Sequence, residues 1–561
     1  MYHFNIHAIM SKLNKNKTKT SWVEPTWEEF SLEYGDNHFL SSLSGEITYT
    51  QNNGLNQTSI RQYKQFQDQN AEIGFMTPPA ADLQLEKAVN ENLHGLFDCE
   101  KFNSLPDLQL SDLNQIEFNN YLKLNRVVEF QINDTEETRL NSTNAVEFPT
   151  HESVMRTGLV FNSGGLPVHS MWCPLKFNDK KYLFLSVVEE DTELSEFSTS
   201  SSCIRILEFD NGKFELTKTI LLDSVVKEFQ FSTISSDSIA LLGLTLSNGT
   251  IEIWKITQDT VTGPTSFHRV SSGPVILKLD NPLLLLTCCT FSSTDTVIAG
   301  TNRGYIAQFR VSTQKLDYLI PTKTCGITNI KCFLPVMADA RNLSVTFSSS
   351  DFSSYFMKLP LPNFRSSILN NIALYEIGIT NKDLMFDRNT DQLSNLKTVL
   401  SVEHPNYIRV STISNPSSMW RYRLDNDKDI SCIAVQKTSG KIQENGLMVF
   451  TGHSNGSVRL FNFFNVHTTY ERKYTSSSIR LMKMNRSAHN PSKFWLDLNY
   501  EVGRLGDIVK KDPFKQVSIA KTRNIRIVDD IMLCPLCVSS LDNSVAVLYD
   551  NGLVVLEELL V

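Results

Sequence analysis

The chain has 561 residues, of which 41% are hydrophobic and 20% charged, and its formal net charge is −8 at pH 7. This length exceeds that of a typical single domain, and the longest apolar runs, such as the one around 283–286, are too short to span a membrane. The 10 cysteines have no framework spacing and the first residues contain no apolar signal core, which favours a soluble intracellular protein over a secreted one.

The first 150 residues form an acidic N-terminal extension. A short basic stub at 12–19 is followed by 21 acidic and 7 basic residues between 21 and 150, a net charge of −14. Such a segment buries little core, so we expect 1–150 to be largely disordered. Two pieces are candidates for docking onto a partner: the aromatic residues Trp22, Trp27 and Phe30, and a weakly helical stretch around 80–96. A solvating tail is the alternative.

Residues 151–561 repeat one pattern, in which an apolar strand, a tight polar turn and a second strand follow one another. Six such hairpins lie at 240–256, 296–311, 344–359, 408–424, 447–463 and 544–559, and a seventh with an enlarged turn spans 182–209. Asn-Gly turns within alternating apolar residues are typical of β-hairpins, and a spacing of about 40 to 64 residues is near the length of a WD blade. The sequence therefore predicts an all-β fold, a seven-bladed WD40-like β-propeller with its hairpin turns on one face.

A basic insertion is expected around 471–526, in the wide gap between the last two hairpins. Residues 471–526 contain 13 basic and 5 acidic side chains, including Arg480, Lys483 and Arg486. Exposed cations can contact a nucleic-acid backbone without reading its sequence. A solvated rim, or pairing with the acidic extension, is the alternative. The candidate DNA-backbone contacts are Arg472, Lys473, Lys510, Lys511, Lys515, Lys521, Arg523 and Arg526.

Catalytic signatures are absent from the sequence, and we predict no catalytic residue, no cofactor-binding residue and no metal ligand. One G-x-S-x-G match, at 452–456, lies between two predicted strands, so it indicates a hairpin turn rather than a nucleophile elbow. Cys534 and Cys537 lack a second ligand pair for zinc and are better explained as part of a buried strand. Binding, not catalysis, is the expected activity.

The segment that opens the predicted propeller has a distinctive motif, in which Gly164 and Gly165 precede Trp172, Cys173 and Pro174. The glycine pair permits a sharp backbone turn, and Trp172 with Pro174 would end a strand against the inner packing. This motif resembles the opening of the WD-repeat propeller subunit in the B-box-binding (tau B) module of RNA polymerase III transcription factor IIIC, of the fungal 91-kDa or metazoan beta type. The turns at 300–307 and 452–459 are similar to turns of the same family.

The resemblance implies a nuclear, non-enzymatic subunit that scaffolds B-box binding for transcription of transfer-RNA genes. It implies other transcription factor IIIC subunits as partners, especially a second β-propeller, and promoter DNA within the complex, with no membrane, cofactor or small-molecule substrate. The chain departs from WD proteins in lacking Trp-Asp dipeptides, and its extension has no Arg-Gly-Arg-Pro hook for direct DNA contact. The alternative function is a WD40 scaffold in another intracellular assembly, such as ribosome biogenesis, a vesicle coat or a motor complex.

Overall fold

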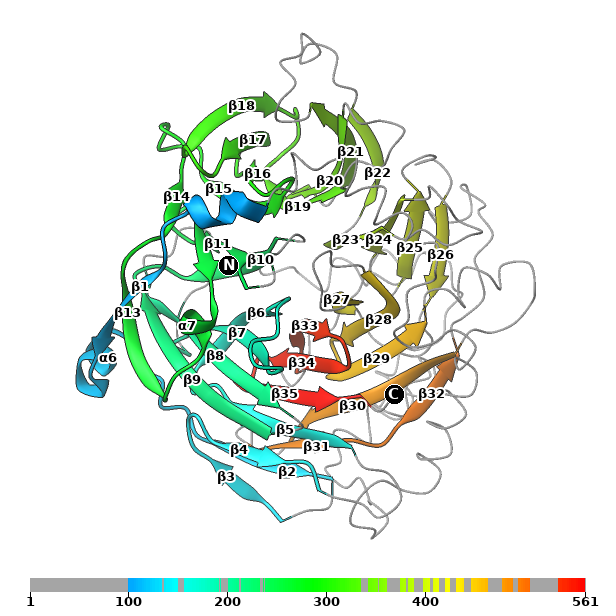
Figure 1. Cartoon of the computed structure of the whole chain (residues 1–561). Coiled ribbons are helices and arrows are strands. Elements are labelled where there is room, and N and C mark those ends of the chain that lie inside the picture. Colours follow the sequence, from blue (N-terminus) through cyan, green and yellow to red (C-terminus); the bar gives the residue numbers. More distant parts are fainter. Residues whose placement is uncertain are drawn as a thin grey trace, which may run out of the picture. The chain divides into compact units, whose positions relative to one another are not determined.

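The described elements of the chain are almost entirely β-strands (Figure 1). Within the described residues, the helices are the 3-10 helix η2 (Cys99–Ser104) and two short α-helices, α6 (Gln115–Tyr121) and α7 (Gln258–Val261). The chain divides into two compact units, and every described strand belongs to the unit made of 49–486 and 490–561. The computed structural model describes 99–133, 136–149, 156–190, 192, 200–210, 213–232, 236, 238–333, 342–351, 353–360, 374–379, 382–387, 397–403, 407–412, 419–423, 430–437, 445–462, 477–487, 493–504 and 533–559.

The strands form seven sheets, and each sheet contains a blade of four antiparallel strands, ordered from the inside of the ring outward. Blade 1 is β6 (Leu166–Trp172), β7 (Lys181–Val188), β8 (Ser202–Asp210) and β9 (Lys213–Leu222); blade 2 is β10 (Val226–Phe231), β11 (Ala240–Leu246), β12 (Ile251–Ile256) and β14 (Val275–Leu277). Blade 3 is β15 (Leu286–Phe291), β16 (Thr296–Thr301), β17 (Tyr305–Arg310) and β18 (Lys315–Pro321); blade 4 is β19 (Ile327–Phe333), β20 (Asn342–Ser349), β21 (Ser353–Pro360) and β22 (Leu374–Ile379).

The second half of the ring has the same plan. Blade 5 is β23 (Lys382–Asp387), β24 (Lys397–Glu403), β25 (Tyr407–Thr412) and β26 (Met419–Arg423). Blade 6 is β27 (Ile430–Lys437), β28 (Asn445–His453), β29 (Ser457–Asn462) and β30 (Ser477–Arg486). Blade 7 is β33 (Pro535–Leu541), β34 (Ser544–Tyr549), β35 (Leu553–Glu558) and β5 (Thr157–Asn162).

The innermost strands close into a ring. Each one contacts the innermost strand of the next blade, in the order β6, β10, β15, β19, β23, β27 and β33, and β33 in turn contacts β6. The outermost strand of blade 7 is β5, which precedes blade 1 in sequence and pairs along its whole length with β35 near the C-terminus. The backbone hydrogen bonds between β5 and β35 therefore close the ring by joining distant parts of the chain in one sheet. The predicted seven-bladed WD40-like β-propeller is confirmed.

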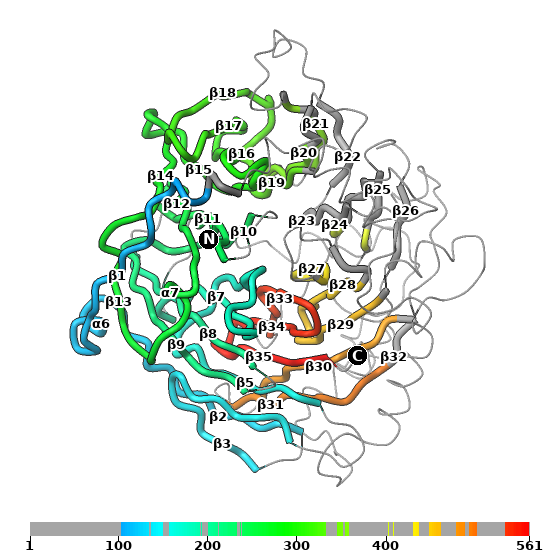
Figure 2. Tube along the Cα trace, in the orientation of Figure 1, coloured from blue at the N-terminus to red at the C-terminus, as the bar shows by residue number. Residues whose placement is uncertain are grey.

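Three blades carry extra strands on their outer edges, and much of this covering comes from 99–149 (Figure 2). Blade 1 gains β13 (Ser266–Ser272) and then β1 (Gln109–Leu113), while blade 7 gains β4 (Ala145–Glu147). Blade 6 gains β31 (Lys493–Asp497), β32 (Glu501–Arg504), β2 (Val128–Ile132) and β3 (Thr138–Leu140). We call residues 99–149 the belt, since they run along the rim of several blades.

The belt differs from the expected lack of secondary structure in 1–150. Its apolar side chains supply the physical reason, because Phe102, Phe118 and Phe130 are each at most 2% exposed and join the cores between blades. The low average hydrophobicity of this segment therefore does not exclude a few buried aromatic side chains that hold it against the blades. Residues 1–98, for which the same expectation was made, lie outside the described residues.

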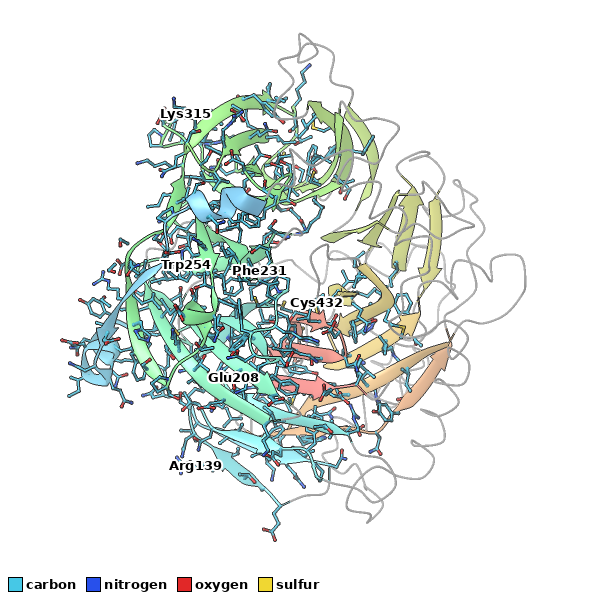
Figure 3. All side chains as sticks on the ribbon, viewed as in Figure 1. Arg139, Glu208, Phe231, Trp254, Lys315 and Cys432 are labelled. Atoms are coloured by element: carbon cyan, nitrogen blue, oxygen red, sulfur yellow. The ribbon has the colours of Figure 1, made fainter. Side chains whose placement is uncertain are left out.

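The blades pack face to face, so their middle strands are buried on both sides. All seven residues of β11, sequence ALLGLTL, are buried, which explains why this strand reads as a continuous apolar run rather than an alternating one. Trp254 of β12 and Phe231 of β10 belong to the core between blades 1 and 2 and are labelled in Figure 3. Blade-to-blade packing therefore supplies the core.

The predicted turns connect the second and third strands of their blades. Gly249, Gly304, Gly456 and Gly552 have φ between +71° and +86°, a conformation that glycine adopts without strain. The predicted hairpin at 408–424 is different, since its two strands are the third and fourth of blade 5. The second-to-third connection there lies one strand earlier, between β24 and β25.

Candidate partner and nucleic-acid interface

The glycine pair of the family-like motif lies where the belt meets the start of blade 1. Gly164 has φ +73°, and a Cβ placed there would come within 2.1 Å of the Ser142 side-chain oxygen. A Cβ on Gly165 would come within 2.2 Å of the Val188 carbonyl oxygen and 2.7 Å of the Leu124 side chain. At Gly164 a larger side chain is therefore disfavoured both by the positive φ and by the neighbouring atom. At Gly165 it is disfavoured by the neighbouring atoms alone.

Asn162 and Ser163 fasten the belt to the ring closure. The fully buried Asn162 side chain donates to the carbonyl oxygens of Arg126 (2.9 Å) and Leu140 (3.0 Å). The Ser163 hydroxyl lies 2.8 Å from the Gly552 carbonyl oxygen, in the turn between β34 and β35. These two residues therefore join the belt, the first-blade motif and the C-terminal hairpin. They were not singled out in the sequence, although they directly precede the glycine pair.

Trp172, Cys173 and Pro174 end the innermost strand of blade 1. The Trp172 indole nitrogen donates to the Ser539 carbonyl oxygen of blade 7 at 3.3 Å, and its ring meets Phe209 edge-on. Cys173 is fully buried, and burial raises the pKa of its thiol to about 12. Trp172 thus bridges two blades, and the Cys173 thiol stays protonated and unreactive at neutral pH.

A buried ion pair at the ring closure was missed by the sequence analysis. The Arg156 guanidinium donates to both carboxylate oxygens of Glu557, at 2.7 and 2.6 Å, and both side chains are at most 2% exposed. It also donates to the carbonyl oxygens of Leu481 and Leu498 of blade 6 and stacks on the Tyr500 ring. The partners are 401 residues apart in sequence, so no local pattern indicates the pair.

The described part of the basic segment is largely occupied by internal contacts. Arg480 binds Asp497 at 2.9 Å and Glu501 at 2.7 Å within blade 6. Lys493 binds Glu137 of the belt at 2.5 Å, and the Arg486 guanidinium lies over the Phe494 ring. The Arg480 guanidinium is therefore used in ion pairs within blade 6. Any phosphate contact by this segment would have to come from its other cations.

Charged groups gather beside the closing turn of blade 7. Burial raises the pKa of the Asp550 carboxyl to about 6, although the charges of Arg126 and Arg486 oppose this shift. One Asp550 oxygen accepts a hydrogen bond from the Cys534 backbone at 3.2 Å. The other is buried without a hydrogen-bond partner among the described residues. Arg126 also binds Glu190 at 3.3 Å.

All eight candidate DNA-backbone contacts and the three aromatic docking residues lie outside the described residues. They are Arg472, Lys473, Lys510, Lys511, Lys515, Lys521, Arg523, Arg526, Trp22, Trp27 and Phe30.

The G-x-S-x-G match is a hairpin turn, because His453 ends β28 and Ser457 begins β29. Cys537 is buried in β33, with Cys534 just before it. In the part of the chain that the structure describes, no cluster of three or more His, Cys, Asp or Glu side chains could hold a metal ion. The helices in that part are all too short or too polar to cross a membrane.

Comparison with known proteins connects the chain to one curated relative. The transcription factor tau 91 kDa subunit of Saccharomyces cerevisiae is 22% identical over 427 residues, which cover 70% of this chain and 57% of the relative. The chain thus spans little more than half the length of that relative. No family model matches.

Among solved structures, the WD40 β-propeller domain of Doa1 is 10% identical and covers 74% of this chain and 96% of that domain, with a TM-score of 0.37. The strand pairings of the ring establish the fold without this comparison. The resemblance of the motif at Gly164–Pro174 and the similarity over 427 residues point to the same relative. The chain is therefore a WD-repeat-like β-propeller that is similar to the transcription factor tau 91 kDa subunit.

Proposed function

We propose that the protein is a non-enzymatic subunit of general transcription factor IIIC that scaffolds the B-box-binding module for RNA polymerase III transcription of transfer-RNA genes. The observation that carries the proposal is the similarity to the tau 91 kDa subunit over 427 residues. A closed propeller supports it physically, since seven blades held by inter-blade packing present rigid surfaces to several partners. The expected site of action is the nucleus.

The partners follow from the same proposal. Other transcription factor IIIC subunits, especially a second β-propeller subunit, would bind the blades, and promoter DNA would be held within the complex. The isolated chain should bind a B-box duplex weakly and without strong sequence preference. Specificity requires contacts to base edges or shape readout, and the basic segment 471–526 offers mainly phosphate attraction.

Purification of the full chain from nuclear extract tests the proposal. A tagged chain should copurify with the other transcription factor IIIC subunits, and chromatin precipitation should recover transfer-RNA genes. A variant with Trp172→Ala, which loses the bridge between blades 1 and 7, serves as the control for a misfolded propeller. Recovery of ribosome-biogenesis, vesicle-coat or motor proteins instead of these subunits would support the alternative scaffold function and contradict the proposal.

A further inference from the structure

Several exposed side chains meet where blades 2 and 3 present their hairpin turns. Leu283 is 68% exposed, and among the large hydrophobic side chains of the described residues only Ile116 is more exposed. Lys278, Arg303 and Lys323 are exposed around it. We call these four residues the blade 2–3 basic patch.

Backbone hydrogen bonds hold the Leu283 loop between two turns. Leu286 donates to the Gly249 carbonyl oxygen in the turn of blade 2, at 3.0 Å, and Asn302 in the turn of blade 3 donates to the Leu285 carbonyl oxygen, at 3.0 Å. The Asn302 side chain also donates to the Leu283 carbonyl oxygen at 3.4 Å. Leu283 is therefore fixed beside both turns.

The three cationic residues lie in the chain next to the same two turns, those of blades 2 and 3. Arg303 is the residue after Asn302 in the turn of blade 3. Lys323 follows Thr322, whose backbone and hydroxyl groups donate to the Gly304 carbonyl oxygen at 2.9 and 2.7 Å. Lys278 follows Leu277, which pairs with Ile251 directly after the turn of blade 2.

The charge of the patch is not balanced by its described surroundings. None of the three cationic side chains makes a hydrogen bond or ion pair with another described residue, and Asp280 is the single acidic residue on the segment 278–285. An exposed aliphatic residue within positive charge fits an acidic peptide that also carries aliphatic side chains. A nucleic-acid backbone would use the cations and leave Leu283 without an apolar partner, because bases stack on aromatic side chains.

We propose that the acidic stretch 80–96 of this same chain docks on the blade 2–3 basic patch. This stretch carries Asp82, Glu86 and Glu91 against one lysine, Lys87. Its aliphatic residues are Leu83, Leu85, Val89, Leu93 and Leu96. Its composition is therefore complementary to the patch in both charge and apolar character.

The point where the belt begins favours this occupant over a separate protein. The stretch ends three residues before Cys99, where η2 starts, and Phe102 of η2 is buried in the core of blades 2 and 3 together with Leu277 and Ile251. A short tether of this kind gives an effective concentration of the order of mM, so even a weak contact forms. The docked stretch covers the patch, and an acidic partner must displace it. This inference does not depend on the proposed function.

Zero-length carbodiimide crosslinking of the full chain tests the contact directly. Asp82, Glu86 or Glu91 should become joined to Lys278 or Lys323 within the monomer, as identified by mass spectrometry. The variant Leu283→Asp/Arg303→Glu keeps both lysines and should lower the yield of these crosslinks about fivefold or more. The matched control Lys213→Glu/Lys315→Glu changes exposed lysines of blades 1 and 3 outside the patch (Lys315 is labelled in Figure 3) and should leave the yield unchanged.

A second variant keeps the propeller sequence intact and so guards against misfolding. Glu86→Lys/Glu91→Lys should reduce protection of 80–96 from hydrogen exchange, and combining it with Lys278→Glu/Lys323→Glu should restore that protection. The proposal is overturned if crosslinks are absent, if they appear only in dimers, or if the Leu283→Asp/Arg303→Glu variant retains the full yield. Loss of duplex DNA binding in that variant, without crosslinks in the parent chain, would instead assign the patch to phosphate.

Discussion

Backbone geometry at the start of blade 1 restricts one position to glycine. Gly164→Ala combines a left-handed conformation with a contact of 2.1 Å to the Ser142 side chain, and we expect it to destabilise the protein by about 2–4 kcal/mol. Gly243→Ala is the matched control, because its Cβ would lie no closer than 3.3 Å to any neighbour. It should change stability by about 1 kcal/mol or less. The midpoints of thermal unfolding of the two variants distinguish local strain from a general intolerance of alanine.

Removing only one partner of the buried pair of Arg156 and Glu557 should lower the stability of the protein strongly. Arg156→Met leaves the Glu557 carboxylate, whose side chain is 1% exposed, without its cation, and we expect a loss of about 3–5 kcal/mol. The double variant Arg156→Met/Glu557→Met removes both charges and should be more stable than Arg156→Met alone. Denaturant titration of the single and double variants tests this order. A double variant less stable than Arg156→Met would contradict it.

Asp550 should make stability depend on pH. Burial raises the pKa of its carboxyl to about 6, above the unfolded value of about 3.9. Between pH 4 and 6 the folded protein therefore binds a proton that the unfolded chain does not, and stability from this group falls as pH rises through that window.

Asp550→Asn removes this titration and still offers an oxygen to the Cys534 backbone. It should match the parent near pH 4 and be more stable by about 1–3 kcal/mol at pH 7. Unfolding midpoints at several pH values measure the difference. A constant offset between variant and parent at every pH would assign the effect to packing instead.

Among the elements, α6 shows how the belt is attached. Phe118 is 2% exposed and its ring lies 4.8 Å from that of Phe267, whereas Ile116 on the same short helix is 77% exposed. Phe118→Ala should cost about 3–5 kcal/mol if the belt and blade unfold together. Ile116→Ala should cost about 0.5 kcal/mol or less. Limited proteolysis between β1 and β2 should speed up in the first variant only.

The sequence predicted the elements that depend on neighbouring residues. Strand, turn and strand lie within about twenty residues of one another, so six of the seven hairpins matched the second and third strands of their blades. The hairpin of blade 5 was displaced by one strand, because the next connection at 413–418 has the same turn residues. The belt strands were missed since β1 pairs with residues about 160 positions away, as between Leu110 and Val270. Local alternation does not indicate such pairing.

In the candidate site, too, the residues that could be predicted are those whose role depends on neighbouring positions in the sequence. Gly164 and Trp172 were identifiable because they belong to one short motif. Asn162 and Arg156 act through partners on other blades and the belt, and their importance depends on the closed ring. A residue whose partners are far apart in sequence can be recognised only after the topology is known.

For the whole molecule, ring closure joins parts of the chain that are far apart in sequence, as in the pair 401 residues apart formed by Arg156 and Glu557. The strand β5 pairs with β35, Ser163 binds Gly552, and Arg156 binds Glu557. Folding therefore requires contacts of very high sequence separation, which are typically slow to form. The belt meets the same region, because β4 pairs with β5 and the Asn162 side chain donates to the Arg126 and Leu140 carbonyl oxygens.

The last prediction concerns the basic segment in the assembled complex and rests on the proposed function. Changing Lys510, Lys511 and Lys515 to Glu should weaken DNA binding across all sequences, since phosphate contacts are independent of base identity. Each lost contact should also reduce the salt slope of the affinity by about 0.9. Measurement of duplex binding at several salt concentrations, with subunit stoichiometry determined on the same preparation, gives both quantities.

The control for this variant changes Lys123, Lys213 and Lys315 to Glu, three exposed residues of the belt and blades 1 and 3. The control variant should fold normally, because exposed charges usually affect stability by about 0.5 kcal/mol or less, and thermal unfolding of both variants checks that they are folded. If the basic segment docks a neighbouring subunit, the Lys510, Lys511 and Lys515 variant will instead lose that subunit from the complex. An intact complex with unchanged affinity and salt slope would leave these lysines as a solvated rim, and phosphate binding by this part of the propeller would have to be abandoned.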